Sequence, residues 1–129
     1  MIPENLNALI KKLIDKTTSK KAVWSKTSRD SEFKLELNKG AIITDNWDDE
    51  NSGMNVDFSI LNEFGDIIER IAFRHIDVDN YNTLMQLHNE AKRSYYKVDE
   101  TIKTIFDELD SEKIVGRERS KDDLPDLPF

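Results

Sequence analysis

The sequence predicts an α+β fold, because two periodicities of apolar residues occupy separate parts of the chain. Between residues 31 and 73, apolar and polar residues alternate in runs separated by turn residues, a pattern typical of half-buried antiparallel strands. On either side of this region, apolar residues recur every three to four positions, as in amphipathic helices. We therefore predict an N-terminal helix, an antiparallel meander of four or five strands and a long C-terminal helix, with both helices on one face of the sheet.

The N-terminal helix is predicted over residues 3–16. Pro3 suits a first helical position, where the backbone N–H needs no intrahelical partner. Lysines near the other end favour the helix C-terminus, because cations stabilise the negative end of the helix dipole. The apolar residues with helical spacing are Leu6, Leu9, Ile10, Leu13 and Ile14.

The strand pattern is clearest over residues 54–60, where Met54, Val56, Phe58 and Ile60 alternate with polar residues. Residues 31–37 and 67–73 show a similar alternation. The turn residues Asn38 to Gly40 connect the first of these strands to another at residues 41–47.

A single long helix is predicted from about Asn80 to Asp110, because the residues of a mainly apolar stripe follow one another at alternating intervals of four and three residues. The residues of this stripe are Leu84, His88, Ala91, Tyr95, Val98, Ile102, Ile105 and Leu109. Such a helix would be on the order of 45 Å long, whereas five strands span only about 20 Å. The overhanging part of the stripe is covered either by another part of the chain or by a second copy in a homodimer. We assign residues 1–110 to one domain and residues 111–129 to a charged, flexible tail.

Composition excludes several classes of function. The net charge is −7, with 26 acidic and 19 basic residues, and this charge disfavours direct nucleic acid binding. There is no cysteine, and hence no disulfide, thiolate nucleophile or cysteine metal site. No apolar run approaches the roughly 20 residues of a membrane span. We expect a cytoplasmic protein with no membrane partner.

No segment predicts catalysis, so we expect no enzymatic activity, no catalytic or metal-binding residue and no cofactor. Of the two histidines, His88 lies on the apolar stripe and is expected in the core, and His75 is expected to form a local hydrogen bond. The acidic segment that contains Asp45, Asp48 and Asp49 is expected to be a solvated hairpin connection. A weaker alternative is a small enzyme or metal protein built on this segment.

The C-terminal residues carry the chemistry of a short recognition peptide. Phe129 combines an aromatic ring with a terminal carboxylate, and Pro128 restricts the backbone before it, which lowers the entropic cost of docking. Acidic residues upstream would steer the peptide toward a basic partner. The predicted partner-binding residues are Asp122, Asp123, Asp126, Leu127, Pro128 and Phe129.

The same residues resemble the acidic C-terminal tip of bacterial single-stranded DNA-binding proteins, which has the form Asp-Asp-Ile/Leu-Pro-Phe. Asp126 to Phe129 match directly, whereas Leu124 and Pro125 interrupt the acidic run. In that family the tip binds replication, recombination and repair enzymes, with the terminal Phe in a pocket and its carboxylate on a basic residue. The remaining chain departs from that family, because it predicts no OB-type barrel and is acidic.

We therefore expect a small acidic protein-interaction module whose C-terminal peptide docks on a basic, hydrophobic tip-binding pocket of a DNA replication or repair enzyme, as partner or as blocker. The alternative is an immunity-protein-like, antitoxin-like or phage-encoded inhibitor that binds its target through the acidic folded surface. In that case residues 120–129 would be dispensable for binding.

Overall fold

The chain forms two compact units, Met1–Val98 and Asp99–Phe129, in a computed structural model that describes residues 2–116. The first unit contains, in chain order, α1 (Glu4–Thr18), β1 (Ser25–Lys26), β2 (Glu32–Leu37), β3 (Gly40–Asp49), β4 (Gly53–Asn62), β5 (Ile67–Arg74) and α2 (Val78–Tyr95). Helix α3 (Val98–Asp110) begins at the boundary and belongs to the second unit. The predicted division into a domain and a tail at residue 110 stays a prediction, because most of the tail lies outside the described residues.

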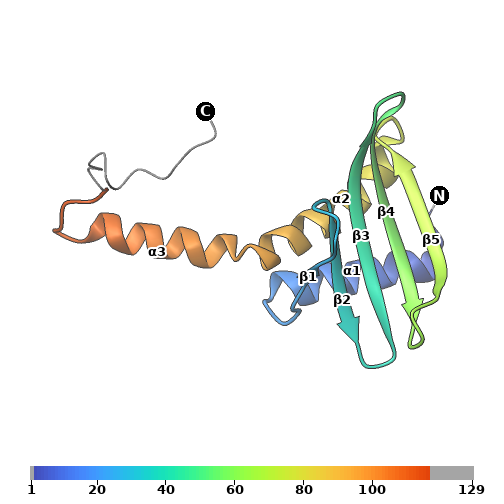
Figure 1. The fold of residues 1–129 in the computed structure, drawn as a ribbon, viewed down its shortest axis with the longest axis horizontal. Helices are drawn as coiled ribbons and strands as arrows, with labels where there is room; N and C mark the ends of the chain where they lie inside the picture. Colours follow the sequence, from blue (N-terminus) through green and yellow to red (C-terminus); the bar gives the residue numbers. More distant parts are fainter. Residues whose placement is uncertain (1, 117–129) are drawn as a thin grey trace. The chain divides into compact units, whose positions relative to one another are not determined.

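The strands form one antiparallel sheet in the order β1-β2-β3-β4-β5, so each strand pairs with its neighbour in sequence (Figure 1). The predicted α+β class and the meander are therefore confirmed, with five strands. Leu37 pairs with Gly40 at the first tight turn, where the sequence places Asn38 and Lys39. A register irregularity between Ile60 and Leu61 interrupts the pairing of β4 with β5.

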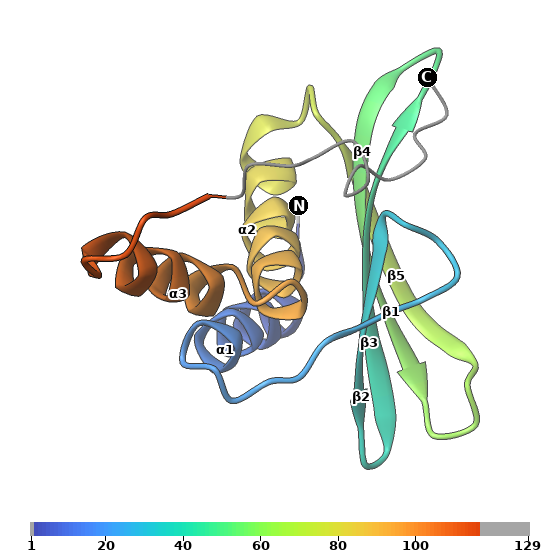
Figure 2. The same ribbon diagram turned by 60° about the vertical axis from the view of Figure 1, so that its left-hand side comes forward.

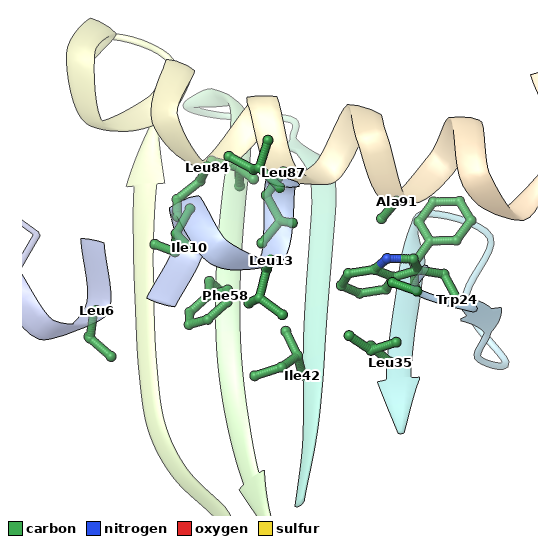
Figure 3. Close-up of a cluster of buried hydrophobic side chains, with 14 of the residues drawn as sticks. Leu6, Ile10, Leu13, Trp24, Leu35, Ile42, Phe58, Leu84, Leu87 and Ala91 are labelled. Carbon is green, nitrogen blue, oxygen red and sulfur yellow. The ribbon is translucent and has the colours of Figure 1, made fainter. Parts of the chain in front are cut away.

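Helices α1 and α2 lie on the same face of the sheet, and the opposite face carries no helix of the first unit (Figure 2). The core between these layers is built from the apolar residues of α1 and α2 and from alternate residues of the strands. Ten of its members are labelled in Figure 3: Leu6, Ile10, Leu13, Trp24, Leu35, Ile42, Phe58, Leu84, Leu87 and Ala91. The N-terminal helix, the strands and the part of the predicted C-terminal helix that forms α2 thus bury their apolar sides in one core.

The link between α1 and β1 is held to the core by side-chain hydrogen bonds. Trp24 donates its indole N–H to Thr17 Oγ1 at 3.0 Å, and Thr17 donates its hydroxyl to the Leu13 carbonyl at 2.7 Å. Ser94 of α2 donates to the Ala22 carbonyl at 3.3 Å. These bonds satisfy the buried polar atoms, which would otherwise cost stability.

The prediction of one continuous helix from Asn80 to Asp110 is wrong, because the chain leaves the helical conformation between α2 and α3. Lys97 has a φ of 53°, in the left-handed region, and its N–H bonds to Ser94 O at 3.2 Å. Basic residues in the last turn of α2 and acidic residues in the first turn of α3 are the sequence signals of two separate ends. The spacing of the apolar residues continues across the break, so the sequence pattern did not indicate that the helix ends there. None of the helices in the described residues is long and apolar enough to cross a membrane.

Candidate protein-binding site

Two buried carboxylates lie on the sheet face that carries no helix. Asp45 of β3 and Asp57 of β4 are directly opposite each other in the antiparallel register and are only 2% and 6% exposed. Their neighbours Thr44 and Phe58 point to the helix-covered face, so strand alternation places both aspartates on the other face. We refer to Asp45 and Asp57 as the carboxylate pair.

Each member of the carboxylate pair is held by its own arginine and by a neutral donor. Asp45 accepts a hydrogen bond from Ser31 Oγ at 2.6 Å and forms an ion pair with Arg29 at 3.0 Å. Asp57 accepts from Trp47 Nε1 at 3.1 Å and from Arg70 at 2.9 Å. Both arginines are about half exposed, whereas both carboxylates are buried. The two negative charges are thus compensated locally, as buried charges require.

This arrangement favours a structural role over proton transfer. A general acid or base must be able to exchange a proton with a bound substrate, whereas these oxygens accept hydrogen bonds from arginine, tryptophan and serine side chains. Within residues 2–116, no group of three or more histidines, aspartates or glutamates is placed to hold a metal ion. The carboxylate pair joins four segments of the chain across the open face of the sheet.

The acidic segment contains a hairpin connection, as we predicted, but the connection is shorter than we predicted. Strand β3 continues through Asp48 to Asp49, and β4 begins at Gly53, so the turn is shorter and Asp45 is a buried strand residue. Asp49 accepts hydrogen bonds from the Ser52 hydroxyl and the Asn51 N–H, and these bonds lower the pKa of its carboxyl. Its role is to cap the turn.

His88 is a core residue, as its position on the apolar stripe predicts. It is buried on α2, its Nδ1 lies 3.1 Å from Thr44 Oγ1, and its ring packs edge-on against Phe33 at 5.5 Å. Burial lowers the pKa of His88 to about 4, so the ring is neutral near pH 7. His75 is exposed, and its Nδ1 approaches the Met54 carbonyl at 3.4 Å.

A shallow pocket of about 220 Å³ lies at the ends of the β2–β3 and β4–β5 hairpins. Its lining includes Lys34, Glu36, Leu61 and Asn62. Pockets that bury a small organic ligand usually have volumes of about 300–1,000 Å³. Lys34 and Glu36 already form an ion pair with each other at 3.3 Å. This pocket is therefore a weak candidate for a ligand-binding site.

Helix α3 is amphipathic, and none of its 13 residues is buried. Its large apolar side chains are 44–60% exposed; we call them the α3 stripe, and they are Ile102, Ile105, Phe106 and Leu109. These positions share one side of the helix, because residues three and four apart are neighbours on a helical surface. Apolar side chains exposed as a contiguous group are typical of interaction sites.

The predicted partner-binding residues Asp122, Asp123, Asp126, Leu127, Pro128 and Phe129 lie outside the described residues. The carboxylate pair was not predicted from the sequence, because no local pattern shows that residues 45 and 57 are cross-strand neighbours. The alternation of Asp57 with Val56 and Phe58 was the available signal, since it placed a carboxylate inside a strand. No family model matches the chain, and no curated protein or solved structure does so either.

Proposed function

We propose that this protein is a non-enzymatic protein-interaction module whose acidic C-terminal unit binds a basic partner protein. The observation that carries this proposal is that the chain becomes much more acidic at the point where the second unit begins. Residues 1–98 contain 16 acidic and 14 basic side chains, whereas residues 99–129 contain ten acidic and five basic side chains. Most of the net charge thus belongs to a unit of less than a quarter of the chain.

A concentrated negative charge favours a basic partner, because charge complementarity raises the association rate and disfavours acidic competitors. The same charge disfavours a nucleic acid as the direct partner. Arg29 and Arg70 do not make the first unit a basic surface that would attract a nucleic acid, because Asp45 and Asp57 compensate their charge.

The partner class that we propose is a DNA replication or repair enzyme with a tip-binding pocket. Support comes from the resemblance of Asp126 to Phe129 to the tip of single-stranded DNA-binding proteins. In this proposal Phe129 fills an apolar pocket, Pro128 limits the flexibility of the peptide, and Asp122, Asp123 and Asp126 face basic residues. Whether the protein recruits the enzyme or blocks it depends on whether the pocket is needed for other partners.

Fluorescence anisotropy tests the proposal with a labelled peptide of residues 121–129 and a purified tip-binding repair enzyme. We expect binding that weakens with rising salt and that is lost in the Phe129→Ala peptide. In the full chain, Phe64→Ala is the matched control, because Phe64 is 81% exposed on the first unit and is changed in the same way. Binding that is indifferent to Phe129→Ala would refute the docking of the tip.

Deletion of residues 120–129 separates this proposal from an inhibitor that uses the folded surface. If the shortened chain binds the enzyme as tightly as the full chain, the immunity-protein-like or antitoxin-like alternative is favoured. If the shortened chain loses binding while its melting temperature stays unchanged, the C-terminal peptide is the binding element.

A further inference from the structure

The α3 stripe is narrow and continuous along the helix. At about 100° per residue, Ile102, Ile105, Phe106 and Leu109 fall within an arc of about 100°. Thr104 and Asp107 lie on the opposite side of the same helix. With 13 residues, α3 is about 20 Å long, which suits a helix that inserts its apolar side into a groove.

Acidic side chains border the α3 stripe. Asp99, Asp110 and the single lysine of α3, Lys103, lie beside the Phe106 edge, and Glu108 lies beside the Ile105 edge. Over residues 98–116 there are six acidic and two basic side chains. A groove that receives this helix therefore needs an apolar floor and basic residues on its rim.

The charge pattern of α3 argues against a second copy of the chain and against a membrane as the binding partner of the α3 stripe. In a pair of α3 helices from two copies, the mainly acidic borders of one helix would face those of the other, with Lys103 as the single basic side chain of α3 to offset them. An anionic membrane surface would repel the helix, because interfacial helices usually carry lysine and arginine on their polar face. A basic protein groove satisfies both the apolar and the acidic parts of α3.

We infer that α3 is a docking helix that inserts Ile102, Ile105, Phe106 and Leu109 into an apolar, basic-rimmed groove on the partner protein. This inference rests on the proposed function, because it gives the same partner a second contact that is separate from the pocket for Phe129. Two linked contacts on one partner bind more tightly than either alone, since the second contact forms intramolecularly.

The first experiment tests whether the α3 stripe is open in the free protein. The chain has no cysteine, so Ile105→Cys and Thr104→Cys each introduce one labelling site, the first on the α3 stripe and the second outside it. We expect an environment-sensitive dye to report a solvent-exposed site in both variants, with a concentration-independent monomer mass by light scattering. A dye shielded only at position 105, or a dimer mass that Ile105→Gln abolishes, would overturn the inference in favour of self-covering or of the homodimer.

The second experiment measures binding of the full chain to the purified tip-binding repair enzyme by calorimetry. We expect Ile105→Gln to weaken binding about tenfold, and the matched Thr104→Gln to leave it unchanged. Glutamine has a high helix propensity, and both positions are exposed, so both variants should keep the fold. A saturating peptide with the tip sequence of a single-stranded DNA-binding protein blocks the pocket proposed for Phe129.

The outcomes distinguish the inference from the proposed function. If Ile105→Gln weakens binding and the peptide also competes, both are supported. If the peptide competes but Ile105→Gln binds like Thr104→Gln, docking of the tip stands and docking of α3 is refuted. If Ile105→Gln weakens binding but the peptide does not compete, α3 docks and the tip does not. If the unaltered chain does not bind the enzyme, both are refuted for this partner class.

Discussion

Asp45 and Asp57 face each other across β3 and β4, and each is buried against its own arginine at about 3 Å. Placing like charges opposite each other on a sheet is ordinarily destabilising. Here Arg29 approaches from the segment before β2, and Arg70 approaches from β5, so each negative charge has a positive partner on its outer side. The carboxylate pair therefore links the sheet from the segment before β2 through to β5.

Replacement of Asp57 by Asn should destabilise the first unit. Asn keeps the shape but loses the charge that pairs with Arg70, and Trp47 Nε1 loses a charged acceptor. Because Arg70 is half exposed and can be hydrated, we expect a loss of roughly 1–3 kcal/mol in the free energy of unfolding. Urea denaturation followed by circular dichroism measures this difference.

Asp48→Asn is the control for this prediction, since Asp48 is an exposed residue of the neighbouring strand β3. It should change the stability by no more than about 0.5 kcal/mol. Equal stability of the two variants would show that the carboxylate pair contributes nothing beyond an ordinary surface charge.

The buried His88 should make stability fall at mildly acidic pH. Its pKa is about 4 in the folded protein and about 6.5 when unfolded, so the unfolded chain binds the extra proton between these values. Its contribution is complete above pH 6.5 and is lost as the pH falls toward 4, to a total of about 3 kcal/mol. His88→Gln, measured by denaturation from pH 4 to pH 7, should flatten this part of the profile.

His75→Gln controls for the general effect of removing a histidine, because His75 is exposed. Its stability should vary with pH as that of the unaltered protein does. If His88→Gln keeps the slope of the unaltered protein, other groups cause the acid sensitivity.

Truncation of Leu87 should be among the more damaging core substitutions. Its side chain is fully buried on α2, and Leu87→Ala leaves a cavity between the helix and sheet layers. We expect a loss of about 3–4 kcal/mol, against at most about 0.5 kcal/mol for truncation of the exposed Phe64. A small effect of Leu87→Ala in thermal unfolding would argue against close packing of α2 on the sheet.

Gly53 and Gly65 form a matched pair that separates backbone strain from steric contact. Their φ values are 86° and 87°, so alanine is strained by about 1 kcal/mol at either position. A Cβ at Gly53 would lie 2.5 Å from His75 Cε1, whereas a Cβ at Gly65 has nothing within 4 Å. Gly53→Ala should therefore be the more destabilising by about 1 kcal/mol, measured by the shift in melting temperature.

Removal of the His75 ring should reduce this difference. In the background His75→Ala, the two glycine substitutions should cost nearly the same. A difference that persists in that background would place the steric conflict elsewhere in the β3–β4 turn.

The sequence alone predicted most of the periodic elements, because apolar periodicity is a local property of the chain. Leu6, Ile10 and Leu13 lie in the core as their helical spacing indicates, and Val56 and Phe58 do so as their alternation indicates. The same spacing misled us at Lys97, because the apolar repeat continues from Tyr95 through Val98 while the backbone does not remain helical. Apolar periodicity shows which side of an element is apolar, but it does not exclude a one-residue left-handed break.

By itself the sequence determined the α+β class, the meander and the acidic C-terminal segment. Turn residues, the alternation of apolar and polar residues, and charge are all local features of a sequence. Only the tertiary structure decided that Asp45 meets Asp57, that Arg29 and Arg70 compensate them, and that α3 keeps its apolar side exposed. The physical reason is that strand register and ion pairing join residues far apart in sequence. Whether an apolar side is covered likewise depends on neighbours that no local pattern specifies.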